Sequence, residues 1–163
     1  PYRAGVARDL MALRPTIVRG NASEILGLAG EASGGRGVDA GDPVAAAEAA
    51  ARSLAQDTGA VIAVTGEVDF VTDGARAVRI TGGSDLMPRV TALGCSLTCL
   101  VGAFAAVVAD PFDATVAALA MFAAAGENAA GPAEGPGSFA WRFLDALAAQ
   151  EPGTIGEYRV QAA

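Results

Sequence analysis

Residues 60–80 read AVIAVTGEVDFVTDGARAVRI, and this stretch decides the fold. Residues 60–64 form a short apolar run of the kind that makes a buried strand. Residues 68–72 and 77–80 are two further strand-like runs, and they flank Asp73-Gly74, a dipeptide typical of hairpin turns. The stretch therefore predicts three neighbouring strands, and the hairpin makes the sheet mixed.

Upstream of this stretch the chain opens with a helical pattern. Residues 4–13 have apolar side chains at helical spacing but no strand before them, so we expect the chain to begin inside a domain. Residues 16–18 form a β-branched run typical of a buried parallel strand. Asn21 then provides a cap for a helix that starts near Ser23.

A linker and a second helix join the two strand regions. Residues 33–42 are rich in glycine and polar side chains and predict a surface loop. Pro43 opens an alanine-rich helix that runs to about Asp57. Strands that alternate with helices of this length indicate an α/β fold, with sites beyond the carboxyl ends of the parallel strands. We predict a single such domain over residues 1–163.

Apolar helices dominate the second half of the chain. A loop at residues 82–89 precedes helical runs at 94–109 and 113–125, and both runs are apolar enough to predict burial. The longest apolar stretch, residues 95–109, is shorter than the roughly 20 residues of a membrane-spanning helix. We therefore expect a buried helix there and no membrane association.

The end of the chain predicts a loop, a helix and a strand. Residues 126–137 contain several glycines and prolines and form the loop. Ser138 is expected to cap an amphipathic helix that ends near Ala149. Residues 155–160 are expected to form the closing strand.

The composition indicates a globular protein and excludes several kinds of chemistry. Of the 163 residues, 52% are hydrophobic and 18% are charged. All eleven basic residues are arginine and histidine is absent, which excludes a histidine-based triad, a histidine-ligated metal, a Schiff base and a P-loop lysine. The net charge of -7 leaves no basic stripe for nucleic acid or an anionic membrane. Cys95 and Cys99 are too close in sequence to link distant parts of the chain, so we expect reduced thiols and a cytoplasmic protein.

Polar residues follow two of the predicted strands. At the first strand's end, Arg19 can pair with phosphate oxygens, and Glu24 on the following helix can hold water or Mg²⁺. A capped helix with a solvated Arg19 and Glu24 explains the same residues. At the second strand's end, the Thr65 hydroxyl can meet a nucleotide, although a tight turn at Gly66 explains that segment equally well.

The sharpest pattern is LMPRVTALGCSL at residues 86–97, a loop that runs directly into an apolar helix. The amino terminus of a helix offers N–H groups and a positive dipole end, which form an anion site without lysine. Cys95 at this terminus should have its thiolate favoured. The alternative is that Cys95 is a small buried apolar side chain, and Cys99 is assigned to that second role.

Four segments together resemble, in order and spacing, the hydroxyethylthiazole kinase family of thiamine salvage: RPTIVRGNASEI (14–25), VIAVTGEVDFVTDG (61–74), LMPRVTALGCSL (86–97) and GPGSFAWRFLDAL (135–147). The resemblance covers nearly the whole chain and corresponds to the carboxy-terminal part of the family, whose front third or more has no counterpart here. It implies a ribokinase-like three-layer fold with a mainly parallel central sheet flanked by helices. It also implies a cytoplasmic homotrimer, with active sites at its subunit interfaces, that phosphorylates the hydroxyl of 4-methyl-5-(2-hydroxyethyl)thiazole with ATP.

The resemblance also assigns roles to single residues. It implies that Arg19 and Thr65 contact ATP and that Glu24, in an N-x-x-E motif, organises Mg²⁺. It places Gly94 in the anion hole and Cys95 opposite the substrate hydroxyl. Because a neutral thiol is a poor base, positioning and charge stabilisation should carry most of the phosphoryl transfer.

Ala92 departs from the family pattern. The family turn usually reads T-G-[TA]-G-C, whereas residues 91–95 read TALGC. The first glycine of that pattern lies near the substrate, so Ala92 is assigned to substrate binding, and a positive φ there would introduce strain of roughly 1–2 kcal/mol. The departure keeps two alternatives open: a ribokinase-like kinase for another small alcohol, and a non-catalytic homologue that binds nucleotide or thiazole without turnover.

Overall fold

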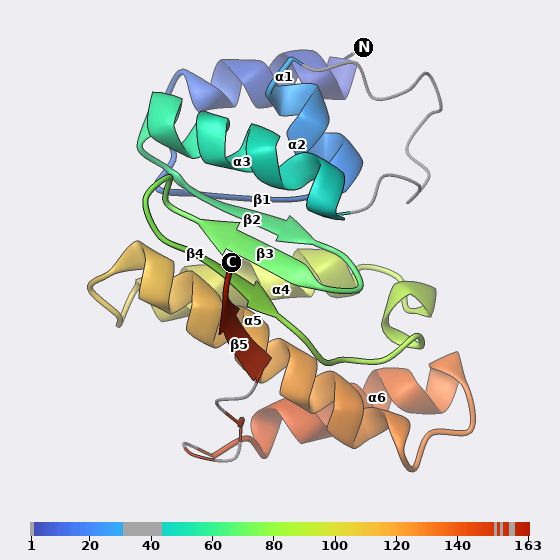
Figure 1. Cartoon of the computed structure of the whole chain (residues 1–163). Helices are drawn as coiled ribbons and strands as arrows, with labels where there is room; N and C mark the ends of the chain where they lie inside the picture. The colour runs from blue at the N-terminus through green and yellow to red at the C-terminus, as the bar shows by residue number, and fades with distance from the viewer. Residues whose placement is uncertain (1, 31–43, 152, 154, 157–158) are drawn as a thin grey trace. The chain divides into compact units, whose positions relative to one another are not determined.

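A computed structural model describes residues 2–30, 44–151, 153, 155–156 and 159–163 of the protein (Figure 1). The chain divides into two compact units, Pro1–Arg79 with Ala162–Ala163, and Ile80–Gln161. The loop predicted at residues 33–42 and the helix start predicted at Pro43 lie outside the described residues. A single domain over residues 1–163 stays a prediction.

Five strands form one sheet in the order β1-β2-β3-β4-β5. Their bounds are β1 Ile17–Asn21, β2 Val61–Thr65, β3 Asp69–Thr72, β4 Ala77–Ile80 and β5 Val160–Ala162. β1 and β2 run parallel, and β3 runs antiparallel to β2. The mixed sheet that the sequence predicts is therefore confirmed.

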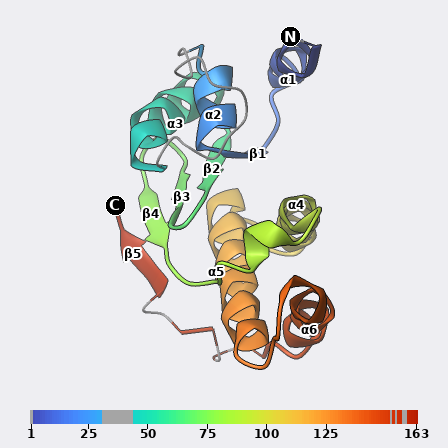
Figure 2. The same ribbon diagram turned by 90° about the vertical axis from the view of Figure 1, so that its right-hand side faces the viewer.

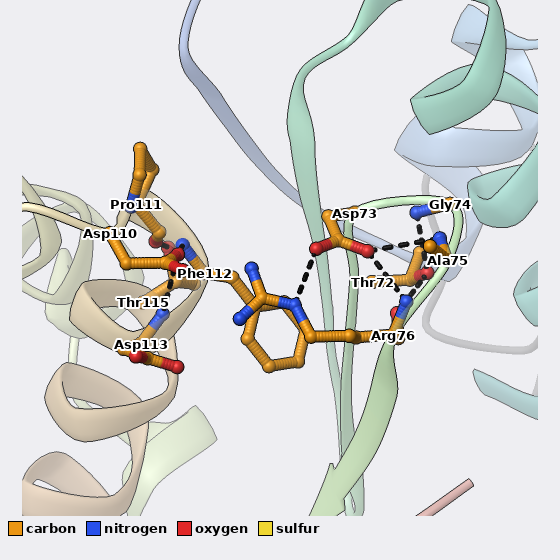
Figure 3. A network of polar contacts seen from close by, with 10 residues as sticks. All are labelled: Thr72, Asp73, Gly74, Ala75, Arg76, Asp110, Pro111, Phe112, Asp113 and Thr115. Carbon is orange, nitrogen blue, oxygen red and sulfur yellow. Dashed lines mark hydrogen bonds and ion pairs between the residues drawn. The ribbon is translucent and has the colours of Figure 1, made fainter.

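The turn between β3 and β4 is held by its own polar side chains (Figure 3). The Asp73 carboxylate accepts hydrogen bonds from the N–H groups of Ala75 and Arg76, at 2.9 and 2.6 Å, and pairs with the Arg76 guanidinium at 2.7 Å. The Thr72 hydroxyl donates to the Arg76 carbonyl at 2.8 Å and accepts from the Gly74 N–H at 3.0 Å. The hairpin predicted at Asp73-Gly74 is confirmed, with Gly74 at a φ of +90°.

The first unit contains three helices among its described residues: α1 Tyr2–Met11, α2 Ala22–Leu28 and α3 Val44–Thr58. The helices predicted for these segments are confirmed. α2 and α3 cover one face of β1 to β3 (Figure 1), and their apolar side chains form a buried core with the strands. Ile62 and Val64 of β2 and Phe70 of β3 are the strand members of this core. These alternate positions show which face of the sheet the helices cover.

The second unit is built around a central helix. Its helical elements are η1 Met87–Arg89, α4 Leu93–Ala105, α5 Pro111–Ala130 and α6 Pro136–Ala148. α5 packs against both α4 and α6 (Figure 2). Phe122 of α5 meets Phe143 of α6 edge to face, with 4.6 Å between the ring centroids. Asp110 caps α5 by accepting the N–H of Phe112 at 2.8 Å (Figure 3).

The predicted burial of the helix at residues 94–109 is wrong for one of its faces. Leu93, Leu97 and Val101 of α4 are buried, at a spacing of four, whereas Cys95 and Cys99 are exposed. Cys99 is therefore not the buried apolar side chain that was expected. The exposed positions carry small or weakly polar side chains such as Ser96 and Thr98, so only the stripe of large aliphatic residues packs on the protein. No helix among the described residues is long and apolar enough to cross a membrane.

Two further predictions about the second unit are wrong: where α5 ends and which residue caps α6. α5 continues to Ala130, past the loop start predicted at residue 126, because Gly126 and Ala129 are buried on the face of the helix that packs against the protein. Ser138 is the third residue of α6 rather than its cap. Its hydroxyl accepts hydrogen bonds from the N–H groups of Glu134 and Gly135, at 2.9 and 3.2 Å, so it closes the turn from inside the helix.

The closing strand begins at Val160 instead of residue 155, and an ion pair precedes it. The Arg159 guanidinium meets the Glu127 carboxylate of α5 through two hydrogen bonds of 2.7 and 2.5 Å. The Arg159 side chain is 6% exposed and that of Glu127 is 40% exposed. Gly82, at a φ of +122°, lies against this pair, and a Cβ there would collide with Arg159 Nη1. The pair therefore anchors the segment after α6 to the helix α5.

Candidate functional site

The junction of β1 and α2 is closed by a reciprocal cap. The Asn21 side chain accepts the N–H of Glu24 at 2.9 Å, and the Glu24 carboxylate accepts the N–H of Asn21 at 2.8 Å. The cap of the capped-helix interpretation is confirmed and Glu24 is exposed, whereas Arg19 is half-buried rather than solvated, with its Nε atom buried. The cap fixes the Glu24 side chain at the carboxyl end of β1, where a ligand of an α/β fold is expected.

Gly20 lets Glu24 lie directly on the strand. A Cβ at Gly20 would stand 3.1 Å from Glu24 Cβ and 3.3 Å from Glu24 Oε2. The cap uses Oε2, and a carboxylate offers a second oxygen, Oε1, to a cation. Among the described residues there is no cluster of three or more potential metal-ligating side chains. Glu24 thus offers one carboxylate oxygen to a cation, and a Mg²⁺ ion bound there would take its other ligands from water and phosphate oxygens.

Arg19 and Thr65 share one face of the sheet. Arg19 is paired with Ala63 in the register of β1 and β2. Paired residues share a face, and so do alternate residues of one strand, which places Thr65 on the same face as Ala63 and Arg19. Ile62 and Val64 point into the α2–α3 core, so Arg19 and Thr65 belong to the opposite face. The Thr65 hydroxyl donates to the carbonyl of Gly20 at 3.3 Å, which links the ends of the two strands.

Asp69 lies on this face as well, although sequence reasoning assigned it no role. Asp69 comes two residues before Val71, which is paired with Ala63, so it shares the face of Arg19 and Thr65. Its carboxylate accepts the N–H of Gly66 at 2.9 Å. The residue as a whole is half-buried, but its carboxyl group is enclosed by protein, and this burial raises its pKa to about 6 against the lowering effects of the Gly66 hydrogen bond and the Arg19 charge. The signal in the sequence was an acid four residues after Thr65.

Ala92, Gly94 and Cys95 lie in the second unit, at the amino terminus of α4. Ala92 is the cap residue, and Gly94 and Cys95 are the second and third residues of the helix. This fully described first turn contains no acidic residue of its own that would offset the positive end of the helix dipole. Cys95 is a free, exposed thiol. The alternative interpretation of Cys95 as a buried apolar side chain is therefore wrong.

The backbone at Ala92 is left-handed, as its place in the turn suggested. Ala92 has a φ of 67° and a ψ of 7° and makes no side-chain hydrogen bond to the helix. Ala92 and Leu93 are the two residues of this turn that differ from the family pattern. Leu93 is buried, so only Ala92 adds a side chain to the exposed surface of the turn. An alanine in this conformation carries strain of roughly 1–2 kcal/mol.

Replacement of Ala92 by glycine should raise the free energy of unfolding by about 1 kcal/mol, because glycine adopts this conformation without strain but is more flexible in the unfolded chain. Urea unfolding followed by circular dichroism measures the change. The matched control is Ala103→Gly in the exposed interior of α4, which should destabilise the protein by up to about 1 kcal/mol. Equal destabilisation by both variants would contradict the strain at Ala92.

The six residues assigned from the sequence thus form two groups. Arg19, Glu24 and Thr65 lie at the carboxyl ends of β1 and β2 in the first unit. Ala92, Gly94 and Cys95 lie within one turn in the second unit. The first group offers a cation, a carboxylate and a hydroxyl, and the second offers a helix terminus with a thiol. Both are suited to a phosphorylated ligand.

Comparison with known proteins gives the family. The family model described as the hydroxyethylthiazole kinase family matches residues 1–151 of the chain. The chain belongs to the hydroxyethylthiazole kinase family. A hydroxyethylthiazole kinase of Gemmatimonas aurantiaca is 68% identical over 151 residues, which are 93% of this chain and 54% of that protein. One from Rhizobium etli is 69% identical over 149 residues, 91% of this chain and 58% of that protein.

A solved structure agrees with this membership in the hydroxyethylthiazole kinase family. The hydroxyethylthiazole kinase protein from Pyrococcus horikoshii OT3 superimposes with a TM-score of 0.87 at 33% sequence identity, covering 99% of this chain and 60% of that one. The α/β fold of ribokinase-like kinases, with helices flanking the sheet, is therefore confirmed. The chain spans a little more than half the length of the curated relatives that it matches.

Proposed function

We propose that the protein transfers the γ-phosphoryl group of ATP to the hydroxyl of 4-methyl-5-(2-hydroxyethyl)thiazole, a step of thiamine salvage. The observation that supports this most directly is the placement of Arg19 and Thr65 on one face of the sheet, at the ends of the parallel strands β1 and β2, in a member of this family. Ligands of open α/β sheets bind beyond such strand ends. An arginine and a hydroxyl at this place suit a nucleotide and its phosphates.

The remaining residues have separate roles in this proposal. Glu24 would hold Mg²⁺, which neutralises charge on the phosphates when it is bound. The N–H of Gly94 and the dipole of α4 would stabilise the negative charge of the transferring group. Cys95 would face the substrate hydroxyl, and Ala92 would contact the substrate. Because the thiol is a weak base, most of the rate acceleration would come from position and charge.

We also propose that the protein is a cytoplasmic homotrimer. The free, exposed thiols of Cys95 and Cys99 suit a reducing compartment. Leu13, Val107 and Trp141 are exposed to 76%, 83% and 53%, and large apolar side chains of this kind support burial between subunits. Light scattering after size exclusion would measure the mass, and a monomer at micromolar concentration would contradict the trimer.

The test of function is ADP release by the purified protein with Mg-ATP, in the presence and absence of the thiazole alcohol. We expect release that depends on the thiazole alcohol. The exposed methyl of Ala92 favours a second candidate, a kinase for another small alcohol, because it changes the surface proposed to meet the substrate. Turnover with another alcohol from a substrate panel would support that candidate. ATP binding without any turnover would support a non-catalytic homologue.

A further inference from the structure

We propose that Asp69 is a positioning residue of the nucleotide site, whose carboxylate fixes the turn after Thr65 through the N–H of Gly66 and balances the charge of the Arg19 guanidinium. The inference rests on the proposed function, since it concerns the same site. It adds a residue to the two that were expected to contact ATP. In this role Asp69 fixes the turn after Thr65 and balances the charge of Arg19.

Thr65 is held from two sides. On the β1 side its hydroxyl donates to the carbonyl of Gly20 at 3.3 Å. On the β3 side the N–H of Gly66, the residue next to it, donates to the Asp69 carboxylate at 2.9 Å. Only three residues separate Thr65 from Asp69, so this hydrogen bond closes the connection between β2 and β3. Without it, the peptide after Thr65 would lose its acceptor and could rotate away from the strand end.

The Arg19 charge acts on the same carboxyl group from β1. Arg19, Thr65 and Asp69 lie on one face of the sheet, and the Arg19 charge lowers the pKa of Asp69. A guanidinium that binds phosphate has to give up much of its side-chain freedom. A carboxylate that holds the side chain beforehand reduces this loss and so improves affinity for the nucleotide. Arg19 is the charged group that acts on Asp69 from across the sheet.

The protonation of Asp69 distinguishes this role from a purely structural one. Burial raises its pKa to about 6, so the folded protein holds the proton more tightly than the unfolded chain does. The ionised carboxylate therefore destabilises the fold as the pH rises through the range from about 4 to 6. A carboxyl group whose pKa is lowered by its partners in the fold would have the opposite effect. Buried groups of this kind gather at functional sites.

The experiment compares Asp69→Asn, Asp69→Ala and the control Glu67→Gln. Asparagine keeps an acceptor for the Gly66 N–H but loses the charge, alanine loses both, and Glu67 is an exposed acid on the same turn. We expect the KM for ATP to rise about threefold for Asp69→Asn and about tenfold for Asp69→Ala, with a smaller change in kcat. The control should stay within about twofold. At pH 7 the melting temperature of Asp69→Asn should rise.

The outcomes separate this inference from the proposed function. If Asp69→Asn lowers the melting temperature and leaves the KM for ATP unchanged, Asp69 serves the fold and the inference is wrong. If the wild-type protein hydrolyses or transfers nothing, calorimetric titration with Mg-ATP replaces KM by Kd. Weaker binding by both Asp69 variants would then support the positioning role even though the kinase assignment fails. Absence of Mg-ATP binding by the folded wild-type protein would overturn both.

Discussion

Arg19→Ala should lower kcat/KM for ATP by about 100-fold or more, because it removes the guanidinium proposed to pair with the phosphates at the end of β1. Coupled detection of ADP with the thiazole alcohol as acceptor measures the effect. Arg19→Lys keeps the charge but loses the planar fork, so it should recover only part of the activity. The control is Arg14→Ala, which removes an exposed arginine before the same strand and should change kcat/KM by less than about twofold.

A comparison of Arg19→Ala with Cys95→Ala tests how much of the rate acceleration comes from charge stabilisation and how much from the thiol. Cys95 is an exposed thiol in the first turn of α4, so its loss should lower kcat by about tenfold or less. An active Arg19→Ala protein together with an inactive Cys95→Ala protein would reverse the proposed roles. The melting temperature of the Cys95→Ala protein should stay close to that of the wild-type protein. Arg19→Ala also removes the charge that balances Asp69, so its melting temperature should fall at pH 7.

Glu127→Ala should lower the free energy of unfolding by about 3 kcal/mol, because it leaves the buried Arg159 guanidinium without its carboxylate. Because Glu127 is partly exposed, the expected loss of unfolding free energy lies at the lower end of the range seen when one partner of a buried ion pair is removed. For a chain of this length the melting temperature should fall by roughly 10 °C. The matched control is Glu48→Ala, which breaks the more exposed Glu48–Arg79 pair and should cost less than about 1 kcal/mol.

The pH dependence of this effect has a definite sign. The hydrogen bonds and charge of Arg159 lower the pKa of the Glu127 carboxyl below its usual value of 4.5. A lowered pKa means that the stabilisation is present above the usual value and is lost as the pH falls through the folded value. The difference between wild-type and Glu127→Ala proteins should therefore shrink in acid. An equal difference at pH 7 and pH 3 would show that the loss comes from packing rather than charge.

Sequence reasoning succeeded where the chemistry is local. Asn21 and Glu24 are three residues apart, and their reciprocal cap follows from the preference of an asparagine side chain for N–H groups at a helix start. The turn at Asp73-Gly74 follows in the same way from side-chain bonds to the neighbouring backbone. These two features place the end of β1 and the edge of the hairpin, whereas the pairing of β1 with β2 joins residues far apart along the chain.

It failed where the partners are far apart along the chain. Glu127 and Arg159 are separated by 32 positions, and no local pattern connects them. In α4 the large aliphatic side chains recur every four residues on the buried face, whereas small or weakly polar residues such as Ser96 and Thr98 are exposed, and the prediction from mean apolarity missed this difference. Asp69 was visible as an acid after a strand, but its relation to Arg19 depends on the register of three strands. Pairings between distant strands are not encoded in any short motif.

The two exposed thiols of α4 allow ligand binding at the amino terminus of this helix to be followed by chemical labelling. Cys95 and Cys99 lie on one solvent-facing side, one helical turn or about 6 Å apart along the axis. An alkylating reagent that reaches both therefore labels the proposed substrate end of the helix and, one turn further, an internal reference. The ratio of the two modified peptides in a mass spectrum would follow occupancy of the helix terminus independently of catalysis, and it would cancel differences in reagent concentration and in global protection.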